Sequence, residues 1–311
     1  PAYINHILPA QAGIMMFSDN GQFLLYTEND IFSPKTARLK KISSYECDPS
    51  IDPVDMGTST MWASTVGAYT RTFEAVIVDA NAPPKIIEQT RVVPEFIPKD
   101  ITLASNSSAL GMVTYGKKGD SNLYHYKYFD SGERRDQSAW FSWTLTGALH
   151  HAIYTAGDFF TVTKQGSDFY LSRHEYVTAS NANSSYTLGT GTVGSTLSTS
   201  RWFEACLDNM KAYNSYQTID ANGLQPITIA FEPTDYDKIY LVVLSGPEAG
   251  AVIKADKDAS SGTTAKFPGI TLVGTSNLVA IGYQYDTLIE LPTYYSAFEP
   301  GKYDLDGDLR I

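Results

Sequence analysis

The chain has 311 residues, and its hydrophobic fraction of 43% can fill one large β domain or two smaller ones, which excludes a disordered chain. The formal net charge is −11, and an acidic chain does not attract phosphate backbones, so a high-affinity DNA reader is excluded. No run approaches the roughly 18 apolar residues of a membrane span, and Pro1-Ala2-Tyr3 lacks the regions of a signal peptide.

Short strand-like runs separated by turn residues begin near the N-terminus. Asn20-Gly21 lies between the apolar runs 14–17 and 22–26, and this arrangement predicts a hairpin because both turn positions tolerate positive φ. A second hairpin is predicted around Gly67, between strands at 60–64 and 68–78. The composition, rich in tyrosine, threonine and glycine, therefore favours β-sheet with tight turns.

Residues 79–100 interrupt this alternation of strand-like runs and turns. Pro83-Pro84, Pro94 and Pro98 cannot donate to a strand ladder, so we predict a proline-rich connector with little internal sheet. The connector has room for one short helix at 86–91.

Closely spaced strands are predicted after the connector, at 101–104, 111–115, 123–129, 138–143, 150–155, 159–163 and 169–177. A meander with strands about 8–12 residues apart indicates a sandwich, a barrel or a propeller. The strands form two groups that each close on large aromatic residues, which favours propeller blades. We therefore predict an all-β fold with β-propeller blades in 1–177.

A stretch dominated by Ser, Thr, Asn and Gly at 178–200 is predicted to be a linker or a long surface loop. A second, smaller β domain is expected over 178–311, with one short helix at most, within 202–214. Its strands are predicted at 226–231, 239–244, 251–255, 269–273 and 278–291. Residues 179–311 carry 8 basic and 15 acidic residues, so this part is the more acidic per residue.

The sequence offers no metal or cofactor site. Cys47 and Cys206 are far apart and are predicted to be free, buried thiols. His150 and His151 are neighbours on a predicted strand, so they should point to opposite faces, one packed and one exposed. Asp304–Asp308 resembles the start of a calcium loop, but its glycine is fourth where an EF-hand needs it sixth, so a turn is predicted.

No catalytic motif is present, because the sequence has no nucleophile elbow, Walker A motif or dinucleotide-binding glycine pattern. Carboxylate pairs for glycoside hydrolysis cannot be found by spacing, since the fold brings them together. We therefore predict that the chain is not an enzyme, and we assign no catalytic residue and no binding residue.

Three alternating tyrosines lie between two basic pairs and share one face of a predicted strand. The tyrosines are Tyr124, Tyr126 and Tyr128, and the basic pairs are Lys117-Lys118 and Arg134-Arg135. An exposed face of this kind can bind sugar or nucleic acid by stacking. The favoured interpretation is a face packed between sheets, with the basic pairs as solvated hairpin ends.

Several ordered segments carry a resemblance to a known family. They are 16–23, 32–37, 44–47, 53–57, 66–73, 93–98, 137–143, 281–285 and 291–293. In this order they resemble the nozzle protein of short-tailed bacteriophages (podoviruses), also called tail tubular protein B. The resemblance runs with gaps from about residue 10 to about residue 295 and is weakest over 178–275.

The resemblance implies a structural protein of the virion tail, formed as a homohexamer at its distal end and bearing a β-propeller. Six copies would surround the channel for genome ejection, through which double-stranded DNA passes without sequence-specific binding. The adaptor protein, tail tubular protein A, and the tail fibres would be partners. Both ends of the chain are expected to be cut from a longer protein. The matched motifs carry no catalytic residues.

Two alternatives remain beside the structural role. A tail-associated polysaccharide hydrolase requires two carboxylates about 5–9.5 Å apart in an open, aromatic-lined cleft. A carbohydrate-binding module requires the face of Tyr124, Tyr126 and Tyr128 to be exposed.

Overall fold

The computed structural model describes residues 3–10, 12–27, 31–77, 85–131, 134–155, 157–174, 185–187, 196–198, 207–231, 233–272, 277–289, 297–299 and 302–303. The chain divides into two compact units, Pro1–Tyr176 and Val177–Ile311. Within the described residues all regular structure is antiparallel β-strand apart from one 3-10 helix, η3 (Tyr236–Lys238), which confirms the all-β prediction.

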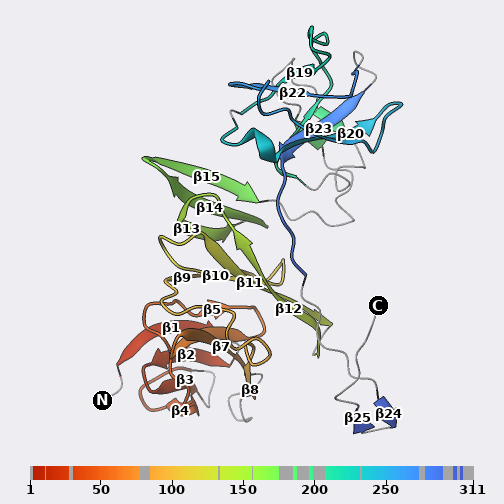
Figure 1. The fold of residues 1–311 in the computed structure, drawn as a ribbon. Helices are drawn as coiled ribbons and strands as arrows, with labels where there is room; N and C mark the ends of the chain where they lie inside the picture. The colour runs from red at the N-terminus through yellow and green to blue at the C-terminus, as the bar shows by residue number, and fades with distance from the viewer. Residues whose placement is uncertain are drawn as a thin grey trace. The chain divides into compact units, whose positions relative to one another are not determined.

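The first unit contains four antiparallel sheets, and in each of them neighbouring strands follow chain order (Figure 1). The first sheet has β1 (Ile4–Ala10), β2 (Gly13–Ser18), β3 (Gly21–Thr27) and β4 (Ala37–Ser43). The second has β5 (Val54–Asp55), β6 (Thr60–Val66), β7 (Tyr69–Val76) and β8 (Lys85–Glu88). The third has β9 (Leu103–Ser107), β10 (Met112–Gly116), β11 (Asn122–Ser131) and β12 (Arg134–Thr144). The fourth has β13 (Ala148–Thr155), β14 (Asp158–Gln165) and β15 (Asp168–His174).

The two predicted hairpins form, but the loop of the first consists of Asp19 and Asn20, and Gly21 is already the first residue of β3. The first hairpin joins β2 to β3 with Ser18 opposite Gly21, and the Ser18 hydroxyl donates to the Gly21 carbonyl at 2.8 Å. The second joins β6 to β7 through Gly67, whose φ of 65° is costly for residues with a side chain. Both predicted hairpins are confirmed.

The four sheets pack face to face in chain order, and apolar side chains fill each of the three seams. The first seam contains Met15, Phe17, Leu24, Trp62 and Phe73. The second contains Met61, Ala63, Val113, Tyr115 and Tyr126, and the third contains Met112, Leu123, Leu149, Ala152 and Phe159. The first strands also lie side by side, because β5 contacts β1 and β9, and β9 contacts β13. In the described residues the sheets close into neither a barrel nor a propeller.

The second unit is built around a four-stranded sheet with the order β18-β23-β20-β21. These strands are β18 (Asp208–Tyr213), β20 (Ile239–Ser245), β21 (Val252–Lys254) and β23 (Leu278–Tyr283). The pairs are β19 (Gln225–Thr228) with β22 (Thr264–Phe267), β16 (Ser185–Thr187) with β17 (Thr196–Ser198), and β24 (Ala297–Glu299) with β25 (Lys302–Tyr303). Tyr213, Ile227, Leu241, Phe267 and Ile281 belong to its buried core.

Several predicted elements are wrong. The helix expected at 86–91 is strand β8, which pairs with β7 because Ile86 and Ile87 are β-branched and half-buried there. The helix expected within 202–214 is strand β18 where it is described, since Ala212 and Tyr213 pair with Ala280 and Val279 of the neighbouring strand β23. No strand covers 269–272, and the strand expected over 278–291 ends at Tyr283.

The prediction for His150 and His151 is also wrong, because both side chains are exposed. The β13–β14 register shifts between Leu149 and His151, and this bulge removes the alternation that would have buried one ring. Cys47 is buried and free, as predicted. Cys206, Asp304–Asp308 and the linker apart from β16 and β17 lie outside the described residues.

Candidate functional site: a buried ion cluster between two sheets

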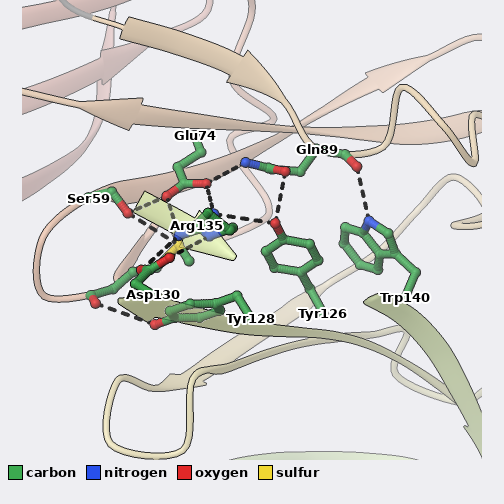
Figure 2. Close-up of polar contacts among 9 residues, drawn as sticks. Ser59, Glu74, Gln89, Tyr126, Tyr128, Asp130, Arg135 and Trp140 are labelled. Atoms are coloured by element: carbon green, nitrogen blue, oxygen red, sulfur yellow. Dashed lines mark hydrogen bonds and ion pairs between the residues drawn. The ribbon is translucent and has the colours of Figure 1, made fainter. Parts of the chain in front are cut away.

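The most unusual feature of the first unit is a buried ion cluster centred on Arg135, at the start of β12. Its guanidinium crosses the seam between the third and second sheets to Glu74 on β7 (Figure 2). Arg135 Nη2 donates to Glu74 Oε1 at 3.0 Å, and Nη1 donates to Glu74 Oε2. On its own sheet, Nε and Nη2 donate to the two carboxylate oxygens of Asp130 at 2.8 and 3.1 Å. One arginine therefore holds two carboxylates with paired hydrogen bonds.

Neutral side chains complete the hydrogen bonding of Glu74. The Ser59 hydroxyl donates to Oε1 at 2.5 Å, and the Gln89 amide donates to Oε2 at 2.5 Å. Gln89 in turn accepts the hydroxyl proton of Tyr126 at 2.8 Å, and its backbone carbonyl accepts from the Trp140 indole at 3.0 Å (Figure 2). In the hydrogen bonds that cross the seam, β11 and β12 supply the donors, and the second sheet and its flanking loop supply the acceptors.

Burial determines the electrostatics of this cluster. The Glu74 side chain is 1% exposed and that of Arg135 is 22% exposed, so neither charge is tolerated without its partner. Burial acts to lower the pKa of Arg135, but the hydrogen bonds that its guanidinium donates to Asp130 and Glu74 outweigh burial and raise that pKa. Burial also raises the pKa of Tyr128 to about 12, and the Arg135 guanidinium lies 4.7 Å from its ring centroid. Arg135 therefore stays charged and the tyrosine stays neutral near pH 7.

The arrangement joins two sheets and does not suit acid–base catalysis. Both Glu74 oxygens are fully engaged, and both Asp130 oxygens bind the same arginine, so neither carboxylate is presented to a substrate. Two cavities lie among the described residues of the unit. One of about 110 Å³ borders the cluster at Ser59 and includes Asp55 as its acidic residue, and one of about 220 Å³ includes Asp52. Neither cavity contains the two carboxylates that glycoside hydrolysis requires.

The structure places the predicted aromatic face inside the second seam. Tyr126 is 1% exposed and Tyr128 is 6% exposed, while Tyr124 is half-buried with its ring 5.5 Å from that of Phe96. The favoured interpretation, a face packed between sheets, is confirmed. The carbohydrate-binding interpretation is wrong for this face because the rings are not available for stacking.

The basic pairs behave differently from each other. Lys118 is exposed, and Lys117 forms a surface ion pair with Asp100 at 3.3 Å, as expected for solvated turns. The prediction that Arg135 is a solvated hairpin end is wrong, because its ion pairs with Asp130 and Glu74 hold the side chain in the seam. The side chain of Arg134 lies outside the description.

Sequence reasoning missed Glu74, Ser59 and Gln89, which come from parts of the chain far from Arg135. One signal was available, because Glu74 is a lone carboxylate in the otherwise apolar run 73–77. A charge in such a run is buried only when it is paired.

A second buried polar group lies in the third seam. His125 is fully buried, with Nδ1 2.7 Å from the Thr114 hydroxyl oxygen, which is itself 2.8 Å from the Tyr154 hydroxyl. Its Nε2 has no hydrogen-bond partner in the described structure. Burial lowers the pKa of His125 to about 3, and burial also lowers the pKa of His174 on β15. Both rings are therefore neutral at pH 7.

The described residues contain neither a metal centre nor a membrane-spanning helix. Among the described residues no group of three or more potential ligands lies close enough to hold a metal ion. Within the same residues no helix has the length and apolar character needed to cross a membrane.

Comparison with known proteins places this all-β chain in a family. No curated protein sequence matches it. The family model described as bacteriophage nozzle protein matches residues 1–304, and so covers 178–275, where the motif resemblance is weakest. The chain therefore belongs to the bacteriophage nozzle protein family, whose members are structural components of the virion tail.

Proposed function

We propose that this chain forms part of the wall of the tail nozzle, through which the genome leaves the virion. The observation that carries the proposal is the family match over 1–304. In this role six copies form a ring at the distal end of the tail, below the adaptor protein and in contact with the tail fibres. Double-stranded DNA passes through the ring without sequence-specific contacts.

The arrangement of the first unit supports propeller blades in 1–177. Each of its four sheets is an up-and-down meander, the sheets stack in chain order, and their first strands lie side by side. A propeller is built in this way, with the first strand of each blade nearest the axis. The second domain, 178–311, shapes the nozzle tip in this proposal.

A structural role also suits the ion cluster. Arg135 binds both of its carboxylates within one seam, and this geometry holds two sheets in register without offering a reactive group to solvent. We infer that the chain acts by shape and rigidity and carries out no catalysis.

The charge of the second domain suits the passage of DNA. Residues 179–311 carry 8 basic and 15 acidic residues, a net charge of −7. A negative wall repels the duplex, and the repulsion acts within about 8 Å at physiological salt. Only charges on the lumen surface contribute, so a lumen lined mainly with lysine and arginine would contradict this mechanism.

Electron microscopy of labelled virions tests the proposed location. An epitope inserted between Gly166 and Ser167, in the exposed turn before β15, leaves the sheet ladder intact. Antibody is expected to bind at the distal end of the tail, and averaged images of the tail are expected to show a sixfold ring. Virions that contain the tagged protein but bind antibody only at the capsid would contradict the proposal.

A sugar-release assay tests the rival enzyme class. The chain is expected to release no sugar from the capsule of a susceptible host. Release that is lost on substitution of a carboxylate would favour the hydrolase.

A further inference from the structure

The third seam differs from the other two because it buries histidine. His125 on β11 is fully buried, and His174 on β15 is half-buried on the opposite sheet. Both rings pack against Trp143 and Phe159, with ring centroids 4.4 and 5.8 Å away for His125 and 5.6 and 5.5 Å away for His174. The described members of the first and second seams include no histidine.

The hydrogen bonding of both rings suits the neutral form. Nδ1 of His125 lies 2.7 Å from the Thr114 hydroxyl oxygen, and Nε2 of His174 lies 2.9 Å from that of Thr161. Nε2 of His125 is buried without a partner in the described structure. A protonated imidazole carries a hydrogen on both nitrogens. Protonated His125 would therefore hold a charge and an unpartnered donor in an apolar seam, which is costly.

Charged groups of the third sheet do not compensate such a charge. Lys127 is the one charged side chain on the described part of the face that His125 shares with β9, β10 and β12. It is a cation itself, and its ammonium donates to the Leu110 carbonyl at the edge of the sheet. The third sheet therefore offers these rings no counter-ion among its described residues.

The fourth sheet offers no nearby carboxylate either. Besides His174, the titratable groups on its inner face are Tyr154, Tyr170 and Asp168. Asp168 lies six residues from His174, which is about 20 Å along an extended strand. Alternation turns Asp158 and Arg173 to the outer face, where they pair with each other at 3.0 Å.

We propose that the third seam is an acid-sensitive joint, in which proton uptake by His125 and His174 separates the fourth sheet from the third while the other two seams stay closed. Two like charges on opposite sheets of one apolar seam repel each other and lose their hydration as long as the seam is closed. In the second seam, by contrast, Arg135 holds Glu74 and Asp130 in ion pairs. The joint lies within one chain, so it goes beyond the proposed ring and does not depend on it.

The direction of the effect follows from the two states of the seam. Burial, and then the charge of His174, lowers the pKa of His125 to about 3 in the closed seam, and opening returns it toward its usual 6.5. The open seam therefore binds the extra proton between these values, and acid favours opening. From pH 7.5 to pH 4.5 the opening equilibrium should rise about 100-fold through His125 alone. Burial also lowers the pKa of His174, so this residue acts in the same direction.

Thiol labelling of the full chain measures the opening of each seam. Ala152→Cys places a thiol in the third seam, where Ala152 is 2% exposed, and Cys47 is the built-in reporter of the first seam. Cys206→Ser removes the remaining thiol from every variant. The label is dithiodipyridine, an aromatic disulfide that reacts with thiols in acid. Each thiol forms a mixed disulfide and releases one thiopyridone, and peptide masses identify the labelled position.

Protection is the labelling rate of the urea-unfolded chain divided by that of the native chain at the same pH. At pH 4.5 the introduced thiol should be at least about tenfold less protected than Cys47, because only its own seam opens. Its protection should fall by about 100-fold or more from pH 7.5 to pH 4.5. His125→Gln should remove about 100-fold of this fall, and adding His174→Gln should remove most of the rest. His150→Gln is the matched control, because His150 is exposed on the same sheet, and it should change nothing.

Three results would overturn the joint. Equal protection of the two thiols at every pH would mean that the seam opens only when the whole unit unfolds. The same protection of the introduced thiol at pH 7.5 and pH 4.5, or a double histidine variant that keeps the full fall, would remove the histidines as its cause. Leu149→Cys, at a side chain 1% exposed in the same seam, is a second reporter that removes volume, for use where Ala152→Cys disturbs packing.

Discussion

Replacing Arg135 with methionine tests whether the ion cluster holds the second and third sheets together. Methionine keeps much of the volume but leaves the Glu74 carboxylate, 1% exposed, without a cation. Removing one partner of a buried pair typically costs about 3–5 kcal/mol. We expect about 3, because Ser59 and Gln89 still donate to Glu74. For a unit of this size that loss lowers the melting temperature by roughly 6–12 °C.

The assay is urea unfolding followed by tryptophan fluorescence, since Trp62, Trp140 and Trp143 lie in the first unit. Lys117→Met is the matched control. It breaks an ion pair whose partners are 39% and 59% exposed, and exposed pairs contribute about 1 kcal/mol or less. Glu74→Gln combined with Arg135→Met should recover part of the loss. An Arg135→Met variant no less stable than Lys117→Met would refute the assigned role of the cluster.

Three further predictions concern the same unit. Burial lowers the folded pKa of His125 to about 3, below its usual 6.5, so the folded state binds fewer protons than the unfolded state between these values. Stability is therefore full above pH 6.5 and falls toward pH 3, and the slope of melting temperature against pH should flatten in His125→Gln. Burial raises the pKa of Cys47 to about 12, so this thiol should resist alkylation at pH 8 until urea unfolds the chain; rapid labelling of the native protein would contradict its burial. Gly111→Ala should lower the melting temperature more than Gly119→Ala. Both glycines have positive φ, but only at Gly111 would an added Cβ clash with a backbone oxygen, that of Tyr128. Equal losses in the two variants would show that the backbone conformation alone causes the loss.

The local part of this fold was predictable because its signals are local. Asn20-Gly21 and Gly67 mark hairpins through residues that accept unusual φ values, and alternation identified most strands of the first unit. Charged edge strands such as β4 were not predicted, because Lys40 and Lys41 interrupt the apolar alternation of the strand. The apolar pair Ile86-Ile87 is compatible with a helix or a strand, and only its pairing with β7 decides between the two.

The site was less predictable because it depends on contacts distant in sequence. Arg135 and Glu74 are 61 residues apart, and nothing near Arg135 distinguishes a buried arginine from a solvated one. The stacking of the second and third sheets brings the two together. The family likewise followed from an ordered set of weak motifs, and the match over 1–304 confirms it.

The position of Arg135 has a consequence for folding accuracy. It lies opposite Asp130 across the β11–β12 hairpin, beside a register shift at Phe129. A slip of one residue would turn every side chain of β12 to the other face of the sheet. Glu74 would then be left as an uncompensated charge in the seam, so the misaligned hairpin could not dock on the second sheet without a heavy penalty. The cluster therefore favours the native register of the β11–β12 hairpin, because only a hairpin in that register can pack its sheet against the second sheet without burying an unpaired charge.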